Sequence, residues 1–394
     1  MRRHLMLAVV AVVIYGALHV PLGRIPVNDG QGWDGRDYAV MLEDGWASGA
    51  VNTQLRPLIV WLAGPAYDLT GSPAVAFDIM NYVYAGLLAF LLSLLMERYG
   101  APLSARAVVI VCIALSNALR LPAYYPVLID LGAHVMMTLA IWTIISGPRW
   151  AATVACVAAV LSREYAPVVL VFGAIRDRRL GVPFLQIVKT YVPAVVVYVA
   201  LRVVVDMRWV NEGNTVQTFV KNLYFWKDPM WAALYAYFAL TSVGGLSLVL
   251  AAQPRRWWRF MREEPEWLAI VLPIAFVTGL VGIDIWRYLT ALTPVAVVVF
   301  ASCYREWSAG ERRVLMSAIV VLTLVTQMPF QGMDLTRYFT DWFPYYAWTN
   351  SAPVDVPRGL LWPGWAWRFL IVTLSMGALT TYANRRGRAV VTTT

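Results

Sequence analysis

Long apolar runs separated by short polar segments repeat along the whole of this 394-residue chain. Most runs are about 16 to 24 residues long, the length that an α-helix needs to cross a hydrocarbon core of roughly 30 Å. The pattern predicts spans at residues 5–20, 73–96, 106–121, 126–146, 150–162, 164–175, 185–205, 230–252, 267–282, 287–304, 312–329 and 362–383. It therefore predicts an all-α fold: a polytopic membrane helix bundle of about twelve transmembrane helices, in one transmembrane domain over residues 1–394.

Two features of this pattern leave alternatives open. The runs at 150–162 and 164–175 are short, and segments of about 10–14 residues are ambiguous, so these two either cross the membrane or form a re-entrant hairpin. The run at 5–20 resembles a signal peptide, but residues 21–24 offer no small-x-small cleavage site. We expect it to remain as the first helix.

The composition excludes a water-soluble fold. Apolar residues make up 60% of the chain and charged residues 14%, whereas a soluble domain has roughly 45–50% and 25%. The cysteines Cys112, Cys156 and Cys303 all lie inside apolar runs and share no metal-ligand spacing. They are therefore expected to be buried thiols rather than part of a disulfide framework or a zinc site.

Positive charge marks one side of the predicted bundle. With the N-terminus in the cytoplasm, the inner loops hold Arg98, Arg106, Arg149, Arg176, Arg178, Arg179, Arg255, Arg256, Arg259, Arg312, Arg313, Arg385, Arg386 and Arg388. This positive-inside pattern predicts a multi-pass protein of the plasma (inner) membrane with both termini cytoplasmic. Because the basic residues are scattered over short loops, no nucleic-acid partner is expected.

Three long polar segments, 21–72, 206–229 and 330–361, are then predicted on the outer side, and function is expected there. The first of them has five acidic residues within 16 positions: Asp29, Asp34, Asp37, Glu43 and Asp44.

The first outer segment has a structure of its own. Its Asp-Gly steps predict tight turns, and from Asp37 onward a helical period predicts a short helix lying in the membrane interface. The stretch Arg56 to Leu69 is apolar but contains Pro65, so it is expected to form a second interfacial helix rather than a span.

Trp33-Asp34-Gly35 with Tyr38, just after the first helix, resembles the acidic motif in the first outer loop of polyprenyl-phosphate-sugar-dependent GT-C glycosyltransferases. Arg56-Pro57-Leu58 is similar to the proline-rich step that follows in those enzymes.

Further similarities occur in the same order along the chain. Asp130 opens the fourth predicted span, where GT-C proteins often have a second acid. Ser162-Arg163-Glu164 breaks an apolar hairpin where they often have a basic residue, and Trp286-Arg287-Tyr288 begins the tenth span. The resemblance covers roughly residues 1–300 and implies a GT-C-like fold with interfacial helices in the first outer loop.

The resemblance also implies a reaction. The donor would be a polyprenyl-phosphate sugar, and its sugar would be transferred at the outer leaflet to a hydroxyl of a lipid or glycan acceptor. Membrane lipids are the other expected partners. A hydroxyl needs a general base near neutral pH, and Asp34 is the first candidate and Asp37 the second. Tyr38 and Glu164 are expected to position the substrate.

The leaving polyprenyl phosphate needs cationic donors in a water-poor site. Arg56, Arg163 and Arg287 are the candidates, because each lies at the outer end of an apolar segment, where an unpaired charge is costly. Alternatively, Arg163 with Glu164 and Arg287 with Asp284 could satisfy each other.

Asp130 and His134 are one helical turn apart and share a face. They form either a simple hydrogen-bonded pair or a pair that positions the sugar or the acceptor. Some GT-C enzymes use a divalent cation such as Mg²⁺ or Mn²⁺ and others do not. No metal ligands are assigned, since only Asp34, Asp37 and Asp130 offer themselves.

Other functions remain open at this point. A transporter or flippase is disfavoured because the chain shows no internal repeat and no matched pair of broken helices. A lipid-linked oligosaccharide polymerase or ligase would have a single very large arginine-containing outer loop, which 330–361 only partly provides. A scaffold or assembly protein is a further alternative.

Overall fold

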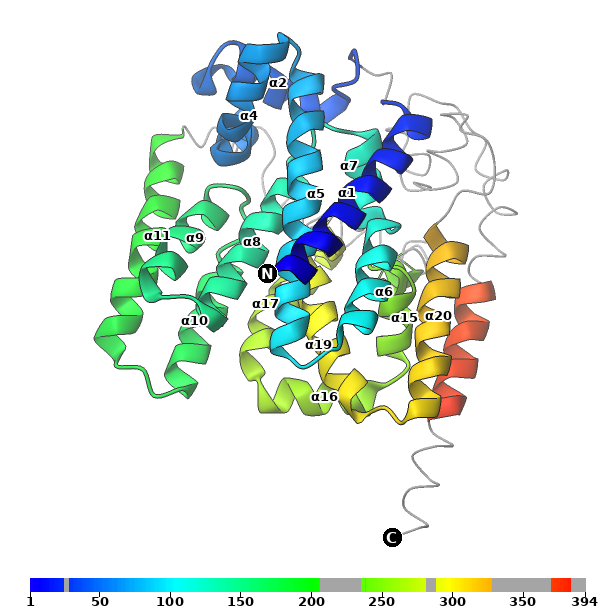
Figure 1. Ribbon diagram of the computed structural model, residues 1–394. Coiled ribbons are helices and arrows are strands. Elements are labelled where there is room, and N and C mark those ends of the chain that lie inside the picture. The colour runs from blue at the N-terminus through cyan, green and yellow to red at the C-terminus, as the bar shows by residue number, and fades with distance from the viewer. Residues whose placement is uncertain (25–27, 206–234, 238, 281–287, 328–369, 384–394) are drawn as a thin grey trace.

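The structure is a computed structural model, and it describes residues 1–24, 28–205, 235–237, 239–280, 288–327 and 370–383. Helices make up 83% of the described residues, which include no strand. The helices form one bundle with short helices across its two ends (Figure 1). The all-α prediction is therefore confirmed.

The described elements follow one another along the chain in this order. They are α1 (Arg2–Leu22), α2 (Trp33–Glu43), η1 (Trp46–Ser48), α3 (Val51–Gln54), α4 (Pro57–Thr70), α5 (Pro73–Arg98), α6 (Leu103–Ala114), α7 (Asn117–Tyr124), α8 (Asp130–Ser146), α9 (Arg149–Val160), α10 (Val168–Arg179), α11 (Phe184–Val204), α15 (Gly245–Ala251), α16 (Pro254–Glu263), η2 (Pro265–Trp267), α17 (Leu268–Leu280), η3 (Thr290–Leu292), α19 (Thr293–Glu306), α20 (Ala309–Gln327) and a helix over Leu370–Ala383.

Four helical stretches are long and apolar enough to cross a membrane: Arg2–Val20, Pro73–Arg98, Leu103–Tyr124 and Phe184–Val204. They coincide with the first, second, third and seventh predicted spans. Shorter apolar helices, among them α8 and α9, occupy other predicted spans. Membrane-spanning helices are thus supported, while the count of twelve stays a prediction, because several predicted spans lie partly outside the described residues.

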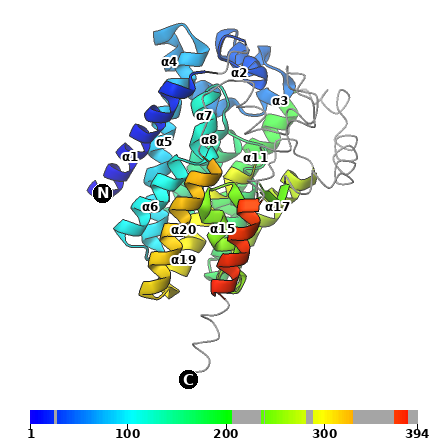
Figure 2. The same ribbon diagram turned by 90° about the vertical axis from the view of Figure 1, so that its right-hand side faces the viewer.

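The pairing of α1 with α5 fixes the two ends of the bundle. The imidazole of His4 bonds to the Ser93 hydroxyl at 2.9 Å, whereas a Cβ added at Gly16 would lie 3.3 Å from the Tyr82 ring. The two helices therefore run antiparallel. We call the end that holds α2 and α4 the α2 end, and the opposite end, where α16 lies, the α16 end (Figure 1). In a view turned by 90°, α2, α3 and α4 again lie together at one end of the bundle (Figure 2).

The helices α9 and α10 form a hairpin whose turn lies at the α2 end. The Leu58 amide at the start of α4 donates to the Leu161 carbonyl in this turn at 3.2 Å. Each helix has 12 residues and is therefore ~18 Å long, less than the ~30 Å of a hydrocarbon core. Both alternatives for this pair, two crossing spans or a re-entrant hairpin, stay predictions.

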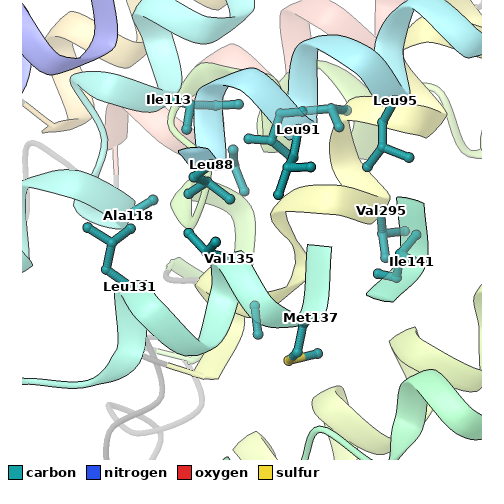
Figure 3. Packing of buried hydrophobic residues seen from close by; sticks show 14 of the residues in the cluster. Leu88, Leu91, Leu95, Ile113, Ala118, Leu131, Val135, Met137, Ile141 and Val295 are labelled. Atoms are coloured by element: carbon teal, nitrogen blue, oxygen red, sulfur yellow. The ribbon is translucent and has the colours of Figure 1, made fainter. Parts of the chain in front are cut away.

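A core of aliphatic side chains packs α5 against α8, and α4 of the α2 end packs on both helices. Leu88 of α5 lies next to Val135 of α8, and Leu91, Leu95 and Leu131 belong to the same buried cluster, whereas Met137 points to the other side of α8 (Figure 3). Gly132 lets the helices approach closely, because a Cβ there would lie 2.8 Å from Ile59 of α4 and 3.0 Å from the Tyr84 ring. Cys112, Cys156 and Cys303 are buried free thiols, as expected.

The first outer segment follows its prediction in part. Asp29-Gly30 does form a turn, with φ of +87° at the glycine, whereas Asp44-Gly45 forms only a bend after α2, with φ of +92° at the glycine. The expected turn at Asp34-Gly35 is wrong, because both residues lie in the first turn of α2, which starts before Asp37. Gly35 is needed there for close packing: its amide donates to the Tyr125 hydroxyl at 3.0 Å, and a Cβ would lie 2.9 Å from Val127.

The stretch Arg56 to Leu69 is a helix, as expected, since α4 covers Pro57–Thr70. Pro57 occupies its first turn, where no amide hydrogen is needed, and Pro65 lies inside the helix without ending it. Its position in a membrane interface stays a prediction.

Candidate functional site

Five polar residues from four segments meet at the α2 end, and we call them the arginine cluster. They are Tyr38 of α2, Arg56 at the start of α4, Asp130 at the start of α8, and Arg163 and Glu164 in the α9–α10 turn. All five were singled out from the sequence, where they are up to 126 residues apart, from Tyr38 to Glu164.

Arg56 is fully engaged inside this cluster. Its Nε donates to Glu164 Oε2 at 2.6 Å, its Nη2 donates to Glu164 Oε1, and its Nη1 donates to the Tyr38 hydroxyl at 2.5 Å. Burial alone would raise the pKa of the Glu164 carboxyl, but the Arg56 and Arg163 guanidiniums outweigh it and hold that pKa at about 2. Burial raises the pKa of the Tyr38 phenol. Glu164 is therefore ionised and Tyr38 neutral near neutral pH.

Arg163 is buried and only partly engaged. Its side chain is 1% exposed, and its Nη2 lies 2.6 Å from Asp130 Oδ1. The ring centroids of Tyr165 and Tyr288 each lie 5.6 Å from the Arg163 Cζ, which is close enough for cation–π contact. In the part of the chain that the structure describes, its Nε and Nη1 have no hydrogen-bond partner.

Unpaired buried N–H groups of a guanidinium are costly, and such groups call for an explanation such as a bound anion. Arg163 therefore offers two buried donors to an acceptor group.

Neighbouring elements hold the cluster in place. The Tyr198 hydroxyl of α11 donates to the Glu164 backbone carbonyl at 3.2 Å. The Leu58 amide bond to Leu161 joins α4 to the α9–α10 turn. The α9–α10 turn is thus held by α4 and α11. Within it, Glu164 pairs with Arg56 of α4, and Arg163 pairs with Asp130 of α8.

The predicted bases lie on the helix that covers the cluster. Asp34 and Asp37 both belong to α2, and Tyr38 of the same helix is fully buried against Arg56. Position 34 precedes Tyr38 by four residues, so the helical period places both positions on one face. The side chain of Asp34 lies outside the described part of the structure, and Asp37 is half-buried. Their role as bases stays a prediction.

The remaining predicted site residues have mixed outcomes. Arg163 pairs with Asp130, and Glu164 pairs with Arg56, so the suggested Arg163–Glu164 pair is replaced by two longer-range pairs. Asp130 and His134 are both buried on α8, and a bond between them stays a prediction. Arg287 and Asp284 lie outside the described residues.

The use of a divalent cation such as Mg²⁺ or Mn²⁺ also stays a prediction. Among the described residues, no three His, Cys, Asp or Glu side chains come together as a metal site would require. The Asp34 side chain lies outside the described residues, so a metal site that includes Asp34 is not tested.

Sequence reasoning missed a second polar cluster at the α2 end, formed by His19, Arg24 and Asp78. Arg24 Nε donates to Asp78 Oδ2 at 2.5 Å, and His19 Nε2 lies 3.7 Å from the same oxygen. His19 Nδ1 donates to the Ala123 carbonyl at 2.7 Å. The signal was present, because an acid inside an apolar span is costly unless it is paired. Arg24 ties the start of the first outer segment to α5, and His19 ties the end of α1 to α7.

Comparison with family models, with curated proteins and with solved structures gave no match for this chain. The resemblance to GT-C glycosyltransferases therefore depends on the sequence motifs alone.

Proposed function

We propose that this protein is an integral membrane glycosyltransferase of the GT-C type that moves a sugar from a polyprenyl phosphate to a hydroxyl acceptor at the outer leaflet. The observation that carries the proposal is the buried Arg163 guanidinium, whose Nε and Nη1 lack a partner in the described part of the chain. An arginine fork matches the oxygens of a phosphate. The proposal includes the twelve-span topology with the α2 end outside.

In this reaction the acceptor oxygen attacks the anomeric carbon, and the bond from that carbon to the phosphate oxygen breaks with inversion. The hydroxyl proton passes to Asp34, or alternatively to Asp37, on α2. The electron pair leaves on the polyprenyl phosphate, which Arg163 stabilises, while Arg56 is held by Glu164 and Tyr38. Asp130 and His134 line the same end of α8 and position the sugar or the acceptor.

A transfer assay tests this proposal. Purified protein is given labelled polyprenyl-phosphate sugars and membrane lipid acceptors, and the wild type is compared with Asp34→Asn and Asp37→Asn. Loss of the base should lower the turnover by ~10²–10⁴-fold. Glu43→Gln is the matched control, because it makes the same carboxylate-to-amide change at an exposed position at the other end of α2.

Two results would contradict the proposal. Undiminished transfer in both Asp variants would remove α2 as the source of the base. Substrate flux into proteoliposomes without transfer chemistry would instead identify a transporter or flippase.

A further inference from the structure

The helix α16 at the α16 end combines strong positive charge with tryptophan. Its ten residues, Pro254–Glu263, read PRRWWRFMRE and include four arginines and two tryptophans. The helix lies crosswise to the long helices at the lower end of the bundle (Figure 1). It is therefore placed as an interfacial helix would be.

The two faces of α16 differ in what they contact. Phe260 and Met261 are buried against the bundle, and Arg256 on the same side pairs with Glu311 at 2.9 Å. The opposite face carries exposed residues at helical spacing: Arg255, Trp258, Arg259 and Arg262. We call these four residues the α16 basic face. Trp258, large and apolar, is 47% exposed there.

Acidic side chains at this end are already engaged with other arginines. Glu266 is fully buried and bonds to Arg176 and Arg179. Glu306 interacts with Arg256 and, at 3.5 Å, with Arg259.

Positive charge on the α16 basic face is therefore only partly compensated, through the contact of Arg259 with Glu306. Neither Arg255 nor Arg262 has an ion pair within the ranges that the structure describes. The helix has one exposed acid of its own, Glu263. The face keeps a surplus of guanidinium groups that meet no carboxylate of the bundle.

We propose that the α16 basic face binds the headgroup phosphates of anionic phospholipids in the adjacent leaflet. Guanidinium groups bind phosphate oxygens in pairs, and the amphipathic ring of tryptophan favours the depth of the headgroups. The charge complementarity selects anionic over zwitterionic lipids. On the predicted topology this is the cytoplasmic leaflet. The lipid binding is independent of the proposed reaction, and only the choice of leaflet rests on the proposed topology.

Lipid binding to the purified full-length protein tests this inference. Phosphatidylglycerol and phosphatidylcholine are titrated separately, and bound lipid is counted by native mass spectrometry. The wild type should prefer phosphatidylglycerol, and Arg255→Gln/Arg259→Gln/Arg262→Gln should lose that preference by about fivefold for each arginine. The matched control Arg98→Gln/Arg178→Gln/Arg313→Gln removes the same charge from exposed positions elsewhere at this end and should keep most of the preference.

The alternative outcomes are decisive. Equal lipid preference in the wild type and the α16 variant, or an equal loss in the control, would overturn the inference. Competition by inorganic phosphate at concentrations equal to those of the lipid would also overturn it, because the face would then be a soluble-anion site. If the triple variant does not fold, Arg255→Gln and Arg262→Gln are measured singly, each with an expected fivefold loss.

Discussion

At the scale of single residues, the two arginines of the arginine cluster are in different states. All three of the donor groups of Arg56 are used by Glu164 and Tyr38. Arg163 has a carboxylate on one side only, and two of its nitrogen atoms have no partner in the described structure. Arg56 is therefore expected to organise the site, and Arg163 to bind the ligand.

Replacing Arg163 by lysine separates these roles. Arg163→Lys keeps a positive charge for Asp130 but removes the fork that a phosphate would need. The donor Kd should rise about tenfold or more, because a hydrogen bond to a charged group contributes ~1.5–3 kcal/mol. Arg56→Lys is the comparison, and it should lower thermal stability more than it weakens donor binding. Equal donor binding by Arg163→Lys and the wild type would contradict the phosphate role.

The ion pair of Glu164 predicts a flat pH response. The folded-state pKa of about 2 lies below the ordinary value of 4.5, so its stabilising effect is complete above pH 4.5 and disappears only as the pH falls toward 2. Glu164→Gln should lower the free energy of unfolding by ~1–3 kcal/mol, equally at pH 5 and pH 8. Thermal unfolding of wild type and variant in the same detergent at both pH values measures this. A difference that shrinks toward pH 5 would show that Glu164 is protonated there.

At the scale of elements, the placement of α2 depends on glycine. Gly32 adopts φ of +74° before the helix, and a Cβ there would lie 2.2 Å from the Tyr125 ring. Gly35 approaches the same ring and Val127. These contacts press α2 against the segment between α7 and α8, and they keep Tyr38 within reach of Arg56.

The variant Gly35→Ala sets packing against helix propensity. Alanine favours a helix by ~0.5–1 kcal/mol, but its Cβ would lie 2.9 Å from Val127, and overpacking costs ~1–3 kcal/mol. We expect a net loss of stability and a larger loss of transfer activity, measured by thermal unfolding and by turnover. Gly64→Ala on α4 is the control, because open space surrounds that position, and it should be neutral or stabilising. A more stable Gly35→Ala protein would contradict the close packing.

Helices were the part of the fold that could be predicted from the sequence, because long apolar runs with turn residues between them determine where helices begin and end. The helical state of Asp34-Gly35 could not be predicted, since only the close contacts with Tyr125 and Val127 explain why glycine is needed inside a helix. The partners of Arg56 and Arg163 depend on how α4 meets the α9–α10 turn, which no local pattern contains. Asp78 lies inside a predicted span, and its pairing with Arg24 depends on how the first outer segment folds back onto α5.

At the scale of the whole molecule, charge differs between the two ends. Acids such as Asp29, Glu43 and Asp44 are exposed at the α2 end, whereas arginines such as Arg98, Arg255 and Arg313 are exposed at the α16 end. The same asymmetry that predicts orientation also separates the arginine cluster from the α16 basic face. The two ends are therefore expected to contact different leaflets and to bind different lipids.

Membrane sidedness is measured by placing single cysteines at the two ends. Glu43→Cys and Glu263→Cys replace exposed acids at the α2 end and the α16 end, and the three natural thiols are buried, which keeps background labelling low. A membrane-impermeant maleimide should label Glu43→Cys in intact cells, and it should label Glu263→Cys only after the membrane is opened. The parent protein reports the background. Labelling of both variants from outside would place both ends on one side and would contradict the bundle's orientation as well as the inner-leaflet position of α16.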